Sequence, residues 1–245
     1  MKFASAGFLL SFCIVSSLSF AQPSELKEYS AYYKASTNGI SGNAERHLIR
    51  TGEQQYRLNI SLEAKVGGIE IGDLEQASEF SWDGELIRPA TYSYQVSGVS
   101  SDIETVSFNW DAGIALSADE DESWSVELDG EILDQLSYQQ ALANDISNGN
   151  QENLAYRLVD GSEIETHNFR LLGTEQIATP MGSFNTVKLE RIRAGDSGRL
   201  TVIWLATDWD YLLTKIEQTN SSGLQIQLEL TNALVAGEQV VPLTQ

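Results

Sequence analysis

Apolar and polar residues alternate along most of the chain. In Arg57–Val66 (RLNISLEAKV) every second residue is apolar, and the same period returns in Leu224–Leu230 (LQIQLEL). A period of two is typical of a strand with one buried and one solvated face. The pattern recurs more loosely in further runs, namely EYSAYYKAS, TYSYQVSGV, DIETVSFNW, SWSVEL, ETHNFRLL and NTVKLERI.

Turn signals separate these runs at short intervals. They are mostly glycines that follow Asn, Asp, Thr or Ser, as in Asn38-Gly39, Thr51-Gly52, Asp83-Gly84, Asp129-Gly130, Asp160-Gly161 and Ser222-Gly223. Short alternating runs with this punctuation indicate antiparallel hairpins. The sequence therefore predicts a mainly β fold, an antiparallel barrel or a strongly curved half-barrel.

One segment follows a helical period instead. In ILDQLSYQQALANDISNGN the apolar residues are spaced to share one helical face, at Leu133, Leu136, Leu142, Ala143 and Ile146. We predict a helix over about 135–147, with Asp134 or Ser137 capping its start and Gly149 ending it. A single amphipathic helix beside a curved sheet is expected to cover the barrel and to bury its apolar stripe in the core.

The first residues have the features of a secretory signal peptide. Lys2 precedes an apolar stretch from Phe8 to Leu18, and small residues stand at Ser19 and Ala21, so we expect cleavage after Ala21. The apolar stretch is too short for a transmembrane helix. No linker divides the rest, so residues 22–245 are predicted to form a single β-rich domain.

Cysteine and charge narrow the possible chemistry. The only cysteine is Cys13, which lies within the predicted signal peptide. The alternative to cleavage after Ala21 is a lipoprotein signal with Cys13 as the lipidated residue, but Phe12 stands before it where such signals carry a small residue. Without Cys13 the chain has no disulfide or thiolate chemistry. The net charge of −20 becomes −21 without Lys2. Such an acidic chain is not expected to bind nucleic acid.

The acidic run Asp119–Glu122 (DEDE) and a protease-like tetrapeptide are both interpreted as turns. The acidic run lacks the ligand spacing of a calcium loop and is expected at a solvated hairpin tip. Ser197 lies in Gly-Asp-Ser-Gly, as in chymotrypsin-like proteases, but the chain offers only His47 and His167 as bases, each inside a predicted strand. We therefore interpret this tetrapeptide as a hairpin turn.

Other catalytic signatures are absent from the sequence. It holds no zincin, nucleophile-elbow or phosphate-loop motif, and we expect no metal site and no cofactor. A pair of carboxylates for glycoside hydrolysis stays open, because 35 acidic residues always allow two to lie near each other.

Two groups of residues are candidate contacts for a ligand or partner. Arg191 and Arg193 share a strand face with Leu189, where they would either bind an anionic group or pair with acids on neighbouring strands. Trp204, Trp209 and Tyr211 stand around Asp208, where they would either line the mouth of a barrel or plug its end.

Longer motifs begin at Leu171. They are Gly173 and Glu175, Thr179–Phe184 (TPMGSF), Thr186–Arg191, Trp204–Ala206, Asp208 and Tyr211-Leu212. Shorter motifs occur earlier in the chain, namely Gly39-Ile40 with Gly42, Arg88-Pro89 before Tyr92, Phe108–Trp110 and Asp134–Ser137. In these motifs the chain resembles the exported bacterial proteins catalogued as domain of unknown function 3108. Two positions depart from the family, since Thr207 and Leu213 stand where its members have proline, and we expect a looser connection there.

The resemblance implies an envelope protein of the Gram-negative periplasm with a barrel-like antiparallel fold, and it implies no known reaction. We predict a non-enzymatic periplasmic or cell-envelope protein without a transmembrane segment, binding a lipophilic small molecule or an envelope protein. The alternatives are a carboxylate-based hydrolase acting in the barrel cleft and a structural scaffold with no ligand. The candidate contacts are Arg191, Arg193, Trp204, Asp208, Trp209 and Tyr211.

Overall fold

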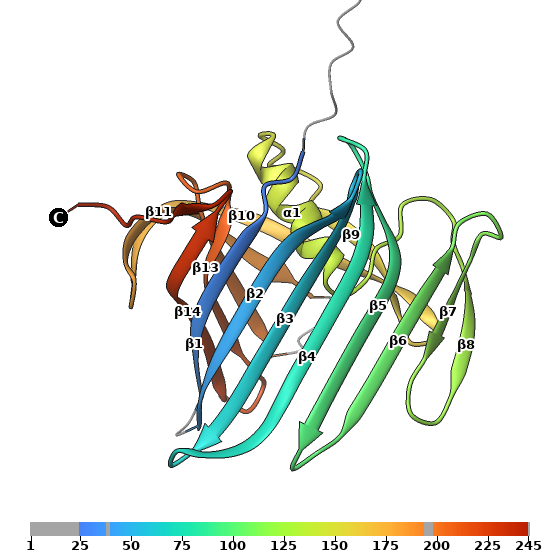
Figure 1. The fold of residues 1–245 in the computed structure, drawn as a ribbon, viewed down its shortest axis with the longest axis horizontal. Helices are drawn as coiled ribbons and strands as arrows, with labels where there is room; N and C mark the ends of the chain where they lie inside the picture. Colours follow the sequence, from blue (N-terminus) through green and yellow to red (C-terminus); the bar gives the residue numbers. More distant parts are fainter. Residues whose placement is uncertain (1–24, 38–39, 194–197, 245) are drawn as a thin grey trace, which may run out of the picture.

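One continuous sheet forms most of the molecule (Figure 1). The computed structural model describes residues 25–37, 40–193 and 198–244. Their elements in chain order are β1 (Tyr29–Thr37), β2 (Ile40–Gly52), β3 (Gln55–Val66), β4 (Ile69–Trp82), β5 (Ile87–Gly98), β6 (Asp102–Asn109), β7 (Ile114–Ala118), β8 (Ser123–Glu127), α1 (Ser137–Ser147), β9 (Ala155–Asp160), β10 (Glu163–Thr179), β11 (Gly182–Ile192), β12 (Leu200–Ala206), β13 (Leu212–Thr219), β14 (Gln225–Val235) and β15 (Glu238–Gln239).

The sheet curls into a nearly closed antiparallel barrel, which confirms the predicted fold class. Most strands pair with their neighbours in the sequence, but β1 pairs with β2 on one side and with β14 on the other. Strands β8 and β9 are left as the two edges. The segment before α1 lines the edge of β9, where the Leu133 N–H donates to the Arg157 carbonyl at 2.8 Å and the Val159 N–H donates to the Leu133 carbonyl at 3.1 Å.

The alternating sequence pattern has the expected effect on burial. In β3, Tyr56 and Leu58 are buried while Arg57 between them is exposed. The inner faces of the strands form one apolar core, whose largest fully buried side chains include Tyr56, Phe80, Leu48 and Leu58. At one hairpin tip, Asp119 accepts backbone hydrogen bonds from Asp121 and Glu122, which confirms the turn predicted for the acidic run.

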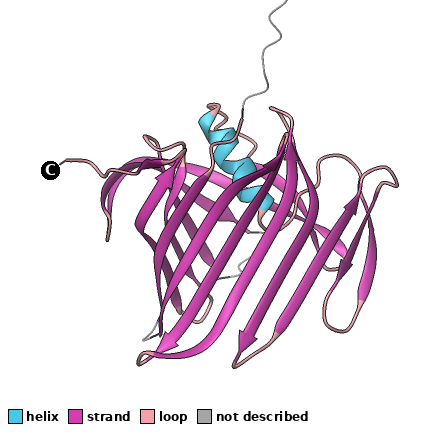
Figure 2. Cartoon of the chain, viewed as in Figure 1, coloured by secondary structure: helices cyan, strands magenta, loops and turns pink. Residues whose placement is uncertain are grey.

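Helix α1 covers the barrel near the end where β1 begins (Figure 2). It starts two residues later than predicted, and Asp134 supports its first turn: Asp134 Oδ1 accepts from the N–H groups of Leu136 (2.8 Å) and Ser137 (2.7 Å). The other oxygen, Oδ2, accepts from the Ser78 hydroxyl at 2.6 Å. This buried carboxylate thus fixes α1 to β4. Gly149, with φ of 80°, follows the helix end as predicted.

The C-terminal segment, residues 238–244, crosses the turn between β10 and β11. Gly182, the first residue of β11, has φ of 142°, and a Cβ built there would lie 2.5 Å from Cβ of Pro242. The Leu243 N–H donates to the Ser183 carbonyl at 2.9 Å. Glycine is therefore required here both by the backbone angle and by the close approach of the C-terminal segment.

Candidate functional site

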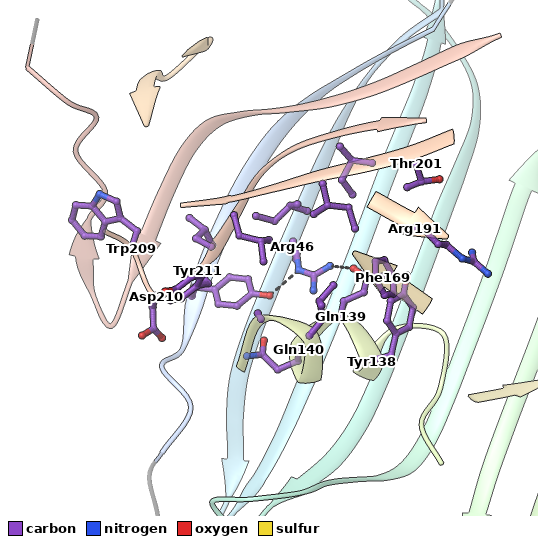
Figure 3. Close-up of a pocket in the computed structure, with 18 of the residues that line it drawn as sticks. Arg46, Tyr138, Gln139, Gln140, Phe169, Arg191, Thr201, Trp209, Asp210 and Tyr211 are labelled. Atoms are coloured by element: carbon purple, nitrogen blue, oxygen red, sulfur yellow. Dashed lines mark hydrogen bonds between the residues drawn. The ribbon is translucent and has the colours of Figure 1, made fainter. Parts of the chain in front are cut away.

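A cavity of about 220 Å³ lies between α1 and the inner face of the sheet (Figure 3). Its wall comes from β1, β2 and β10–β14, and its floor is one face of the helix. The apolar lining residues are Leu142, Ala143, Phe169, Ile203, Leu205, Leu212, Leu213, Ile216 and Val235. Polar and charged side chains make up about half of the lining, so the cavity combines an apolar surface with groups that can orient a ligand.

Arg46 is the most buried charged side chain of the lining. It is only 5 % exposed, because β2 turns it inward between Ala44 and Leu48. Its Nε donates to the Tyr29 hydroxyl at 2.7 Å, and its Nη1 donates to Gln139 Oε1 at 2.6 Å (Figure 3). The helix and two strands therefore hold one guanidinium in the cavity wall.

Arg191 and Arg193 also line the cavity, on the face shared with Leu189. Arg191 Nη2 pairs with Glu165 Oε1 at 3.1 Å, whereas Arg191 Nε is buried without a hydrogen-bond partner. Arg193 bonds to the Thr201 hydroxyl at 3.2 Å and to the Arg199 carbonyl at 3.4 Å. Burial, Arg191 and Arg199 all lower the pKa of Arg193. Within the described ranges, Arg191 therefore makes the cross-strand ion pair that was one alternative, and Arg193 makes none.

The β12–β13 turn forms the rim of the cavity. Trp209, Asp210 and Tyr211 all line it, and Lys27 pairs with Asp210 at 3.1 Å. Asp210 and Tyr211 each have φ of 55°, a left-handed conformation that is uncommon for residues other than glycine. Two consecutive strained residues at a rim indicate a backbone held in place by its surroundings.

Hydrogen bonds fix this turn in the absence of the family's prolines. The Thr207 N–H donates to the Asn185 carbonyl at 3.0 Å, and the Thr207 hydroxyl donates to the same oxygen at 3.3 Å. Trp209 Nε1 donates to the Val241 carbonyl at 3.1 Å, which ties the turn to the C-terminal segment. The turn is thus tied to β11 and to the C-terminal segment, in place of the looser connection expected from the sequence.

Two of the six candidate contacts lie outside the cavity lining. Trp204 Nε1 donates to Glu175 at 2.6 Å, and the ammonium groups of Lys188 and Lys215 lie 5.1 and 5.4 Å from its ring centroid. Asp208 accepts from Asn185 Nδ2 at 3.0 Å. The other four, Arg191, Arg193, Trp209 and Tyr211, all line the cavity.

The two histidines interact with carboxylates. His47 contacts Ser30 at 3.0 Å and Glu45 at 3.2 Å, and the buried His167 contacts Glu165 at 3.0 Å. Burial and then Arg191 lower the pKa of His167. Ser197 lies outside the described residues, but the strands on either side of it, β11 and β12, pair as an antiparallel hairpin.

Carboxylates are scarce in the cavity. Among the described residues that line it, Asp210 alone carries one. Asp160 and Glu165 lie close together on β9 and β10, where burial and then Glu165 raise the pKa of Asp160, but neither residue lines the cavity. Within the described ranges, no group of three or more His, Cys, Asp or Glu residues is placed to hold a metal ion.

Sequence reasoning did not find Arg46, Tyr29 or Gln139. For Arg46 a signal was present, since it occupies the apolar phase of ISGNAERHLIR between Ala44 and Leu48. A charged residue at one of the inward-facing positions of a strand must either lie at an exposed strand end or enter the interior. Its partner Gln139 lies on α1, 93 residues further along the chain, so the pairing depends on where the helix docks.

Comparison with known proteins identifies relatives without an assigned activity. A family model described as protein of unknown function DUF3108 matches residues 28–231. A β-barrel-like protein of domain of unknown function DUF1849 from Brucella abortus superposes with a TM-score of 0.56 at 9% identity, over 86% of this chain and 99% of that one. A protein of Parabacteroides distasonis described as a putative lipoprotein gives a TM-score of 0.35 at 9% identity, over 85% and 96%.

The first of these structures supports the barrel fold alone, because the identity is low. Comparison with curated proteins gives no match. In the part of the chain that the structure describes, no helix has the length and hydrophobicity to cross a membrane.

Proposed function

Because the chain belongs to the DUF3108 family of proteins of unknown function, we propose its function from the cavity: it binds a lipophilic small molecule inside the barrel, as a non-enzymatic protein of the cell envelope. The observation that carries this proposal is the cavity of about 220 Å³ between α1 and the sheet. Small barrels either fill their interiors with side chains or keep room for one ligand. This barrel is filled by aromatic residues such as Tyr56 and Phe80 at some levels, and it keeps a space beside α1.

The lining fits a lipophilic ligand better than a substrate for hydrolysis. Ile203, Leu205 and Leu213 form an apolar patch on adjacent strands of its wall. A hydrolase with two catalytic acids needs a pair of carboxylates at the substrate. The described part of the lining contains one carboxylate, Asp210, which is paired with Lys27 at the rim. A scaffold with no ligand would gain stability by filling this space. The cavity therefore favours ligand binding over both alternatives.

Envelope localisation is part of the same proposal, and its support is the signal-peptide pattern of residues 1–21. Cell fractionation with a C-terminal epitope tag tests it. We expect the protein in the periplasmic fraction, shorter than the full chain by the signal peptide. A full-length protein in the cytoplasm would contradict the proposal.

Binding is tested with N-phenyl-1-naphthylamine, a neutral apolar dye that fluoresces when it leaves water. We expect saturable binding to residues 22–245, displaced by decanol. Ala143 lines the cavity from α1, so Ala143→Phe is expected to fill the space and to reduce dye binding at least about tenfold. Ser147→Phe is the matched control, because it adds the same ring to an exposed position of the same helix. Equal dye binding by both variants would refute the cavity as the site.

A further inference from the structure

The cavity contains a buried cation without a counter-charge. Arg46 is 5 % exposed and makes two hydrogen bonds, both to neutral side chains, Tyr29 and Gln139. Across the described residues, no ion pair includes Arg46 and no protein atom accepts from its Nη2. A buried charge is costly unless a partner compensates it. This chain has 35 acidic residues against 15 basic ones, so the lack of an acid beside Arg46 is not due to a shortage of acids.

The same cavity holds two further arginines with little compensation. Glu165 neutralises Arg191, but the buried Nε of Arg191 has no hydrogen-bond partner. Among the described residues, Arg193 bonds only to neutral oxygens, those of Thr201 and of the Arg199 backbone. The rim pair of Lys27 and Asp210 adds no net charge. The cavity wall therefore carries an excess of positive charge inside a strongly negative protein.

The three guanidinium groups act on one point of the cavity. The buried hydroxyl of Tyr138, on the first turn of α1, interacts electrostatically with all three. Burial raises the pKa of Tyr138, and Arg191, Arg46 and Arg193 each lower it. A negatively charged group beside this phenol would experience the field of all three cations.

We infer that the cavity binds single-chain anionic amphiphiles, with a carboxylate or phosphate group against Arg46 and the alkyl chain along Ile203, Leu205 and Leu213. This inference rests on the proposed lipophilic function and specifies the chemical class of the ligand. The free Nη2 of Arg46 donates to the anion, while Tyr29 and Gln139 hold the guanidinium in orientation. Arg191 and Arg193 add positive potential without needing contact.

The cavity volume sets the size of the ligand. Pockets for drug-sized molecules usually have about 300–1,000 Å³, and this cavity is smaller at about 220 Å³. A single alkyl chain of medium length fits such a space, whereas a two-chain phospholipid does not. The anionic group therefore belongs to a fatty acid or an alkyl phosphate.

The test compares ligands that share one alkyl chain and differ in the end group. Decanoate, decyl phosphate, decanol and decyltrimethylammonium are each titrated into residues 22–245 by calorimetry and by displacement of N-phenyl-1-naphthylamine. We expect decanoate or decyl phosphate to bind at least about tenfold more tightly than decanol, which corresponds to a hydrogen bond to a charged group. Decyltrimethylammonium is expected to bind more weakly than decanol.

Variants at Arg46 locate the preference. Arg46→Met keeps an unbranched side chain but shortens it and removes the charge, and it is expected to abolish the preference for the anion while the affinity for decanol stays within about twofold. Arg57→Met is the control, because Arg57 pairs with Glu79 on the exposed outer face. If Arg46→Met does not unfold cooperatively and is therefore misfolded, Arg193→Met is used in its place to test the anionic ligand. Arg193→Met is expected to reduce the preference for the anion by about threefold.

The outcomes separate the two proposals. No binding of dye, decanol or decanoate refutes the lipophilic function itself. Equal binding of decanoate and decanol leaves that function standing and refutes the anionic ligand. An unchanged preference in the deciding Arg variant also refutes it. If acetate or inorganic phosphate binds as tightly as the alkyl compounds, the cavity is a site for free anions, and the proposal of an amphiphilic ligand is refuted.

Discussion

Replacing Gly182 by alanine tests whether the C-terminal segment is packed on the barrel. The backbone angle φ of 142° at this position costs an alanine about 1–3 kcal/mol. The new Cβ would also lie 2.5 and 2.6 Å from two ring carbons of Pro242, so the segment must move. Movement of the C-terminal segment would break the hydrogen bond from the Leu243 N–H to the Ser183 carbonyl, which contributes about 1 kcal/mol.

We therefore expect Gly182→Ala to lower the free energy of unfolding by about 2–4 kcal/mol. Gly161→Ala is the matched control: its φ is also positive, at 57°, but nothing lies within 4 Å of the new Cβ. That substitution should cost about 1–2 kcal/mol. For a chain of this size, each kcal/mol lowers the melting temperature by about 2–4 °C. Urea unfolding followed by tryptophan fluorescence measures both variants.

Truncation before Pro242 isolates the contact with the C-terminal segment. In the truncated chain, Gly182→Ala should cost about 1 kcal/mol less than in the full chain, because the clash and the hydrogen bond are both absent. The cost of Gly161→Ala should be the same in both. Equal costs of Gly182→Ala in the two backgrounds would refute the packing of the segment and leave backbone strain as the whole effect.

Three further substitutions test other contacts. Asp134→Ala should cost at least about 3 kcal/mol in urea unfolding, because it leaves buried donors without partners, whereas Asp83→Ala removes a similar cap from an exposed turn and should cost less than about 1 kcal/mol. The pKa of His167 is lowered below its ordinary value of 6.5, so protonation favours the unfolded state and the free energy of unfolding should fall as the pH drops below about 6.5. His167→Gln should reduce this fall. If the variant shows the same dependence of stability on pH as the parent protein, the role of His167 is refuted. Thr207→Pro should lower the melting temperature by a few degrees because it removes the N–H bond to Asn185; a higher melting temperature would contradict this role.

The fold could be predicted because its signals are local. The alternation in Arg57–Val66 sets which side chains of β3 face inward, and short turns leave antiparallel pairing as the simplest arrangement. The helix was predicted from its period and from Asp134, which does support the first turn. A barrel-like antiparallel fold also followed from the family resemblance.

The site was predicted only in part, because its contacts join distant segments. Arg191 and Arg193 were found as a basic pair, but their neighbour Arg46 comes from β2, far away in the sequence. Trp204 shows a different difficulty. All residues of β12 from Thr201 to Ala206 are buried, so alternation cannot tell which face turns inward. Lys188 and Lys215 cover Trp204 on the face away from the cavity.

The pairing of β1 with β14 has a consequence for how the molecule is made. Tyr29 lies beside Leu48 in one direction and beside Val235 in the other. Strand β1 therefore keeps an unpaired edge during synthesis until β14 has been made. Such distant pairing slows folding and leaves an open strand edge available to other chains. Loss of the final twenty residues removes most of β14, which would divide the sheet between β1 and β13 and expose an unpaired edge on each part.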